Sequence, residues 1–244
     1  MFDTAQVDEF PKPGFLSKDF CQEPVKRTMQ PTVTGTSVIG CKYNGGVIIA
    51  ADTLGSYGSM ARFRDISRIC KYNDSCVVAG SGDIADFQHI QSMLESMSHE
   101  ELIRDNGYQK SPQEIYSYLT RLMYQRRSKM NPLWNTLMVA GFKNGKPFLG
   151  QVDKLGIAYE APTISSGFGA YLAEPLLRVA SEKENFDYDK ARAVIEECLK
   201  VLYYRDARSF NRYEIVVINK NGVTIEQPKA VPTNWEVAHC VKGY

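Results

Sequence analysis

Three turn signals, each between two runs of strand-forming residues, constrain the fold of this sequence more than any other feature. They are Asn44-Gly45-Gly46, Asn144-Gly145 and Asn221-Gly222. Asn and Gly adopt the positive φ angles of tight hairpin turns at little cost, so each signal predicts an antiparallel hairpin. The strands expected around the turns are 36–43 with 47–52, 136–142 with 147–152, and 213–219 with 223–226.

Amphipathic helices are expected in pairs between these hairpins. The first helix begins near Asp83, because apolar residues recur after it at spacings of three and four. The second begins at Ser111-Pro112, where Ser can cap the helix and Pro fits its first turn. A second helix pair is expected over 172–184 and 189–204, and further strands over 66–72, 76–80 and 156–160.

The resulting order is strands, two helices, strands, two helices, strands. Hairpin-linked strands form antiparallel sheets, and each amphipathic helix must cover a sheet face. The sequence therefore predicts an α+β domain in which two stacked sheets lie between two helix pairs. Residues 1 to about 35 carry several Pro and Gly breakers without periodicity, so an irregular leader is expected there. These breakers include Pro11, Pro13, Gly14, Pro24 and Pro31.

Charge and composition exclude several classes of function. Lys plus Arg (29) nearly balance Asp plus Glu (28), which offers no electrostatic basis for binding nucleic acid or an anionic membrane. The apolar run Val47–Ala51 is far too short to cross a bilayer. The early acidic residues Asp3, Asp8 and Glu9 are atypical of a signal peptide. We therefore expect no membrane and no nucleic-acid partner.

Metal and cofactor motifs are missing from the sequence. The three His residues are far apart and form no HExxH pattern, so no metal site is expected. The six Cys residues include no CxxC pair, which predicts free thiols in a reducing compartment. Gly80-Ser81-Gly82-Asp83 lacks the Gly-Lys-Ser/Thr ending of a phosphate loop and predicts a strand-to-helix turn capped by Asp83. No cofactor is expected.

Several strings carry a resemblance to one family. Thr36-Ser37-Val38-Ile39-Gly40, followed by Gly45 through Asp52, resembles the opening of a proteasome β subunit. Three longer strings narrow the resemblance to the β type of the seventh ring position. They are Gly55 through Ser59 on to Ile69, Arg126 through Thr136, and Tyr203 through Ser209.

The resemblance runs from about Thr28 to the C-terminus and implies a fold and a domain plan. The implied fold is the four-layer αββα sandwich of the N-terminal-nucleophile hydrolases, in agreement with the order of elements. The implied plan is a removable leader over 1–27, cut between Arg27 and Thr28, then a domain over 28–244. A C-terminal extension is expected from about residue 229, reaching subunits of the opposite ring.

The resemblance also allows the family's active site to be tested residue by residue. An active subunit uses an N-terminal threonine hydroxyl as nucleophile and the free α-amine of that threonine as base. The matching positions are Thr36 after the cleavage-like Gly35, the orienting Asp52, and the supporting Asp206 and Ser209. Two positions depart from the pattern, because Arg68 replaces the family's lysine and Phe168 replaces a serine. Guanidinium is larger than ammonium, planar and permanently charged, so the site is expected to be degenerate and without a catalytic residue.

The expected function is that of a non-catalytic subunit of the proteasome core particle in the cytoplasm and nucleus. It would complete the β ring, support assembly and contact other α and β subunits in stacked heptameric rings, with assembly factors as further possible partners. A cut between Arg27 and Thr28 would leave the nitrogen of Thr36 in a peptide bond and remove the base. The alternative is a catalytically active threonine endopeptidase subunit that uses Thr36.

Overall fold

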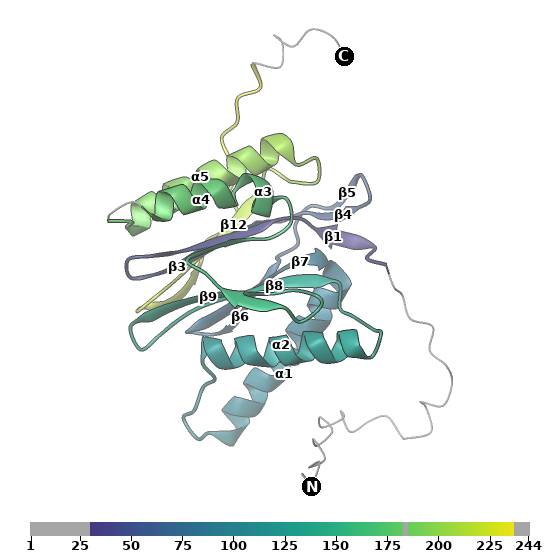
Figure 1. Cartoon of the computed structure of the whole chain (residues 1–244), viewed down its shortest axis with the longest axis vertical. Helices are drawn as coiled ribbons and strands as arrows, with labels where there is room; N and C mark the ends of the chain where they lie inside the picture. Colours follow the sequence, from purple (N-terminus) through teal and green to yellow (C-terminus); the bar gives the residue numbers. More distant parts are fainter. Residues whose placement is uncertain (1–29, 183–184, 237–244) are drawn as a thin grey trace.

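The computed structural model describes residues 30–182 and 185–236, which form a four-layer αββα sandwich (Figure 1). Two antiparallel sheets stack face to face, α1 and α2 cover the outer face of one, and α3 to α5 cover the outer face of the other. The α+β fold expected from the hairpins and helix pairs is confirmed. The proposed leader 1–27 and the cut between Arg27 and Thr28 lie outside the described residues.

Among the described residues, the larger sheet has eight strands in the order β10-β9-β8-β7-β1-β4-β5, with β6 also paired to β7. Its strands are β1 (Val33–Gly35), β4 (Gly55–Tyr57), β5 (Met60–Phe63), β6 (Ile69–Asn73), β7 (Cys76–Asp83), β8 (Asn135–Lys143), β9 (Lys146–Val152) and β10 (Ala158–Glu160). The smaller sheet has the order β11-β2-β3-β12-β13. Its strands are β2 (Val38–Tyr43), β3 (Gly46–Asp52), β11 (Thr163–Ser165), β12 (Tyr213–Asn219) and β13 (Gly222–Ile225).

Each helix begins where local chemistry favours it. The helices are α1 (Ile84–Arg104), α2 (Pro112–Ser128), α3 (Gly169–Leu172), α4 (Glu174–Ser181) and α5 (Tyr188–Arg205). The Asp83 carboxylate accepts from the Asp86 amide and caps α1. Ser111 and Glu114 form a reciprocal capping box at the start of α2. The capping roles predicted for Asp83 and Ser111 are therefore confirmed.

Three apolar layers hold the sandwich together. One lies between the smaller sheet and α3 to α5, another between the larger sheet and α1 with α2, and a third between the two sheets. Ile48 and Ile49 illustrate the arrangement, because adjacent strand residues face opposite sides. Ile48 contributes to the layer under the helices, and Ile49 contributes to the layer between the sheets.

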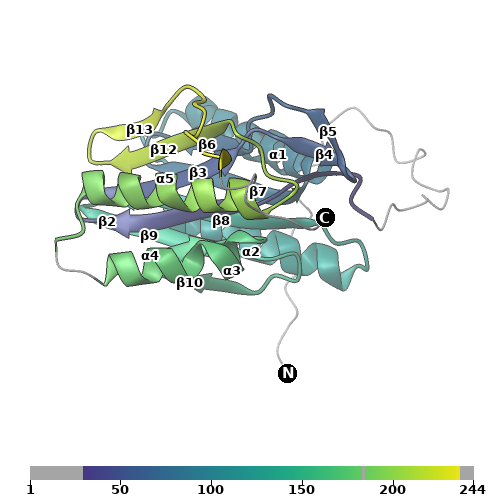
Figure 2. The same ribbon diagram turned by 90° about the horizontal axis from the view of Figure 1, so that it is seen from above.

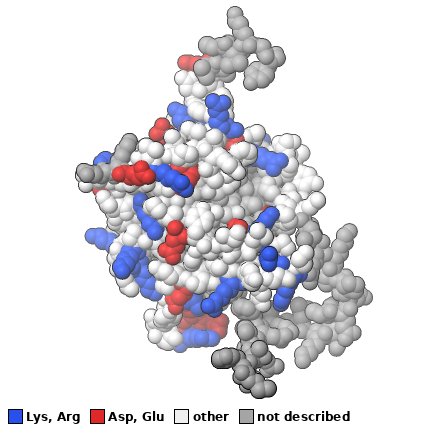
Figure 3. Space-filling view, viewed as in Figure 1, with Lys and Arg blue, Asp and Glu red and all other residues white. Residues whose placement is uncertain are grey.

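Charges of both signs are spread over the face visible in Figure 3. Four thiols, those of Cys41, Cys70, Cys76 and Cys198, are free and buried, while Cys21 and Cys240 lie outside the described residues. None of the described helices is long and apolar enough to span a membrane.

The predicted first strand, 36–43, was wrong in one important respect. The chain is in strand conformation before Thr36 and after Ser37, but these two residues connect β1 in the larger sheet to β2 in the smaller sheet. The expectation of an irregular leader up to residue 35 was also wrong for Val33–Gly35, which form β1. The cause is tertiary, because β1 gains hydrogen bonds from β4 and β7, far along the chain.

Other boundaries also differ from the prediction. Strand β6 begins at Ile69 rather than at residue 66, and the turn expected at Gly80–Gly82 is instead part of β7. The helix expected over 172–184 is two helices, α3 and α4. Pro175 lacks the N–H that would bond back into the preceding turn, so α3 ends and a new helix begins. Strands β4, β5 and β11 were not predicted.

Candidate functional site

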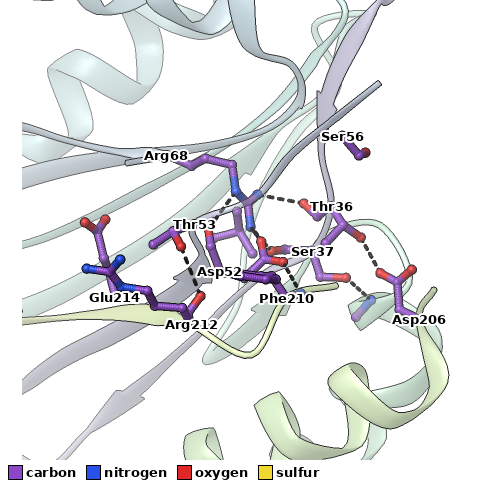
Figure 4. Close-up of polar contacts among 12 residues, drawn as sticks. Thr36, Ser37, Asp52, Thr53, Ser56, Arg68, Asp206, Phe210, Arg212 and Glu214 are labelled. Atoms are coloured by element: carbon purple, nitrogen blue, oxygen red, sulfur yellow. Dashed lines mark hydrogen bonds and ion pairs between the residues drawn. The ribbon is translucent and has the colours of Figure 1, made fainter. Parts of the chain in front are cut away.

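The connection between the two sheets brings the predicted site residues together (Figure 4). Thr36 lies where the chain leaves β1 for β2. Its hydroxyl donates to the carboxylate of Asp206, and its carbonyl accepts a hydrogen bond of 2.8 Å from Arg68 Nη1. Thr36 is therefore held through both its side chain and its backbone.

Arg68 occupies the centre of the site and is 0 % exposed. Its Nη2 forms an ion pair with Asp52 Oδ1 and donates to the Ser37 carbonyl at 2.8 Å. Its Nε donates to the Asp52 carbonyl at 3.0 Å, and Nη1 donates to the carbonyls of Thr36 and Gly80 at 2.8 and 3.3 Å. One planar side chain thus binds β3, β7 and the β1–β2 connection. A compact ammonium could not reach so many acceptors in fixed directions.

Asp52 is the counter-charge and lies at the end of β3, nearly fully buried. Its Oδ2 accepts a hydrogen bond of 2.9 Å from the Phe210 amide. Burial raises the pKa of the Asp52 carboxyl above its usual value, while the charge of Arg68 and the Phe210 amide oppose that rise. The carboxylate therefore depends on Arg68 to remain charged in this position.

The Arg68 side chain packs directly against Gly35, the residue before Thr36. A Cβ placed on Gly35 would overlap the Arg68 Cδ, so the guanidinium stem already fills the space next to this glycine. All three nitrogens of the guanidinium are donating to Asp52 or to carbonyl oxygens. Arg68 is thus used as a structural crosslink.

Asp206 follows the last turn of α5 and is buried. One of its carboxylate oxygens accepts from Thr36, and the other accepts from the Arg208 amide at 2.9 Å. Ser209 joins the group through its backbone, whose N–H donates to the Asp206 carbonyl at 3.0 Å. Phe168 is exposed and lines, with Thr36 and Asp206, a cavity of about 420 Å³.

The residues before Thr36 are part of the larger sheet. Gly35 pairs with Gly82 of β7, and Thr34 pairs both with Asp83 of β7 and with Ser56 of β4. The chain therefore enters Thr36 from a strand that is held on both edges. As long as the chain is not cut between Gly35 and Thr36, the Thr36 nitrogen is an amide rather than an amine.

The structure thus links four of the candidate residues in a chain of contacts, from Asp206 to Thr36, from Thr36 to Arg68, and from Arg68 to Asp52. Two serines of the same site were missed, Ser37 and Ser166. Ser37 Oγ accepts from the Gly169 amide at 2.9 Å, and Ser166 Oγ accepts from the Val38 amide at 2.9 Å. Ser37 follows Thr36, and Ser166 precedes Gly167. These positions were the only signal in the sequence for the two contacts, since serine side chains in turns often form hydrogen bonds with nearby backbone groups.

Among the described residues, no group of three or more His, Cys, Asp or Glu side chains could hold a metal ion.

Comparison with known proteins places this geometry in a family. The family model described as Proteasome subunit matches residues 32–218. The chain is 56% identical to the proteasome subunit beta type-4 of Xenopus laevis, over 91% of this chain and 92% of the relative. It is 45% identical to the proteasome subunit beta type-7 of Saccharomyces cerevisiae, over 91% and 87%. It is 40% identical to the beta type-4 subunit of Arabidopsis thaliana, over 90% and 89%.

Proposed function

The chain belongs to the proteasome subunit family, and we propose that it is a non-catalytic β subunit that completes a ring of the core particle. The observation that carries the proposal is the set of contacts that Arg68 makes around Thr36. A fully buried Arg68 crosslinks the backbone around Thr36, and β1 continues through Gly35 into it. The hydroxyl is present and Arg68 stands at the position of the family's lysine. On this proposal the peptide bond before Thr36 is kept, so the amine that would act as the base never forms.

The partners follow from the same proposal. A ring position is filled by surfaces complementary to two neighbours, and a heterologous contact of this kind closes into a ring. We expect other proteasome α and β subunits as permanent partners, in stacked rings, and assembly factors as transient ones. The C-terminal extension would contribute to contacts with the opposite ring. Its described part rests on α5, where Trp235 packs edge-on against Tyr203 and Tyr204.

We also propose that the protein works in the cytoplasm and nucleus. The four buried thiols support this, because free cysteines persist in a reducing compartment. Cell fractionation with an antibody against the chain tests the location, and recovery mainly in a secretory fraction would contradict it.

The alternative, an active threonine endopeptidase, is favoured by one contact. The Thr36 hydroxyl already donates to Asp206 and faces the cavity of about 420 Å³. A cut directly before Thr36 would create the amine that the mechanism requires. The two functions therefore differ in whether the Thr36 hydroxyl acts as a nucleophile in peptide-bond cleavage.

Substitution in the assembled particle separates them. Particles with Thr36→Ala should hydrolyse peptide substrates at the wild-type rate per particle, because no cleavage depends on this hydroxyl. Thr34→Ala is the matched control, since Thr34 is two residues away in β1 and its hydroxyl lies near Ser56. Loss of one class of cleavage with Thr36→Ala but not with Thr34→Ala would establish the active subunit instead.

A further inference from the structure

The β4–β5 hairpin forms one edge of the larger sheet and depends on β1 for its place there. Strand β4 pairs with β1 on one side and with β5 on the other, and β1 in turn pairs with β7. In the described part of the chain, β1 is therefore the strand that connects the hairpin to the body of the sheet. The residues of β1, directly upstream of Thr36, thus attach the hairpin to the rest of the sheet.

The hairpin presents an apolar surface that nothing in the described chain covers. All four residues of β5 are exposed. Tyr57, Met60 and Phe63 are 55%, 58% and 44% exposed. An edge strand with unpaired backbone groups and large apolar side chains is a template for another chain.

Two arginines make this edge cationic. Arg62 stacks over the Phe63 ring at 5.5 Å, and Arg64 follows two residues later. Asp65 is the adjacent acid, and it pairs with Arg212 at 3.4 Å. Neither Arg62 nor Arg64 forms an ion pair with any residue that the structure describes. The surface therefore suits a partner with apolar and acidic groups.

The opposite edge of the same sheet offers exposed apolar side chains and one carboxylate. Strand β10 ends the sheet beyond β9, and Figure 2 shows it on the other side of the molecule from β4 and β5. Ile157 and Tyr159 are exposed there, and the exposed Glu160 adds an acid. Related subunits that share this sheet can join one edge to the opposite edge of the next subunit, which is the head-to-tail contact that builds a ring.

We propose that the edge formed by Tyr57, Met60, Arg62, Phe63 and Arg64 docks against the β10-type edge of an adjacent proteasome subunit, an edge with exposed apolar and acidic side chains. The proposal rests on the proposed function as a ring subunit. It also explains why the residues of β1, upstream of Thr36, would be retained, because β1 pairs with β4 and holds the docking hairpin in the sheet.

Site-directed cross-linking in the particle tests the partner. The full-length variant Met60→Cys is labelled with a photoreactive maleimide before assembly, because the proposal buries position 60 in the particle, and the labelled particles are then purified. The adduct is expected on an adjacent subunit of the same ring, in the segment that corresponds to residues 155–160 here. Leu102→Cys, in the last turn of α1, is the matched control, since Leu102 is exposed and Figure 1 shows α1 on the other side of the molecule from β4 and β5. It should not give that adduct.

Each other outcome is decisive. The docking proposal is overturned if the adduct forms within the same chain, with a second copy of it or with another region of a neighbour, or if no adduct forms. These results would leave the proposed function as a ring subunit intact. Failure to recover the chain in any particle would instead overturn the proposed function.

Charge reversal tests whether the partner edge carries acidic groups that attract Arg62 and Arg64. The variant Arg62→Glu/Arg64→Glu should lower incorporation of the chain into particles by about tenfold, because like charges would meet across the interface. The control Arg62→Lys/Arg64→Lys keeps the charges and should incorporate within about twofold of wild type. Equal incorporation of the two variants would show that the partner edge is not acidic.

The role of β1 has its own test. A chain produced with Thr36 as its first residue lacks β1, and the amides of the β4–β5 hairpin should exchange with deuterium at least about tenfold faster than in the longer chain. The amides of β8 serve as the internal control and should change little. Unchanged protection of the hairpin would show that β1 does not support it.

Discussion

Replacing Arg68 with Met tests whether this side chain holds the site together. Arg68→Met keeps an unbranched stem of similar length but removes every donor. The Asp52 carboxylate would then be buried without its counter-charge, and the carbonyls of Thr36, Ser37 and Gly80 would lose a donor. Breaking a buried ion pair from one side costs about 3–5 kcal/mol. That is a large fraction of the roughly 5–15 kcal/mol that stabilises a domain.

The cost should depend on pH in a defined direction. Burial raises the pKa of the Asp52 carboxyl, and loss of Arg68 removes the charge that opposes that rise. A raised pKa in the folded state penalises folding only at pH values where the unfolded carboxyl is ionised. The destabilisation caused by Arg68→Met should therefore be largest near neutral pH and should shrink as the pH falls toward the ordinary Asp pKa of about 4.

Urea unfolding of the full-length chain, followed by tryptophan fluorescence, measures both effects. Two controls separate charge from packing. Arg68→Lys keeps a cation and should cost less, about 1–3 kcal/mol, because fewer carbonyls lose their donor. Asp52→Asn in the Arg68→Met background removes the unpaired charge and should recover part of the loss. A cost below about 1 kcal/mol for Arg68→Met at neutral pH would refute the reasoning, since it is smaller than the loss expected from one buried unpaired group.

Three further predictions concern other contacts. Gly35→Ala should destabilise the fold by about 1–3 kcal/mol in the same unfolding assay, because its Cβ would overlap the pinned Arg68 side chain; an unchanged midpoint would contradict this. Ser111→Ala should cost about 1 kcal/mol, since the capping box at α2 is lost. Arg192 lowers the pKa of Glu226 to about 2, so this pair stabilises the fold above pH 4.5, and the contribution is lost as the pH falls toward 2. Glu226→Gln should therefore flatten the acid limb of the stability–pH profile, and an unchanged limb would exclude the pair as its cause.

Local chemistry made much of the fold predictable. The Asn144-Gly145 turn forms as expected, with φ values of 53° and 75° that few other residues adopt at low cost. The apolar stripe of the first helix is buried at Ile84, Phe87, Ile90 and Leu94. Such signals lie within a few residues of each other, so they can be read without knowing the tertiary structure.

The parts of the fold that were not predicted depend on contacts with residues distant in the sequence. β1 has its place because β4 and β7 pair with it. β5 shows no alternation of apolar and polar residues because both of its faces are exposed. For the site, the departure at Arg68 was visible in the sequence. Its contacts with four backbone carbonyls were not, because the residues that provide them are separated by up to 44 positions in the chain.

The first residue of the mature chain, determined by intact mass and N-terminal sequencing of the subunit isolated in its native particle, tests the central claim most directly. The non-catalytic proposal predicts a start upstream of β1, at Thr28 or nearby, so that Thr36 keeps its peptide bond and β1 stays in the sheet. A start at Thr36 itself would contradict it, because the free amine required for threonine catalysis would then be present despite Arg68.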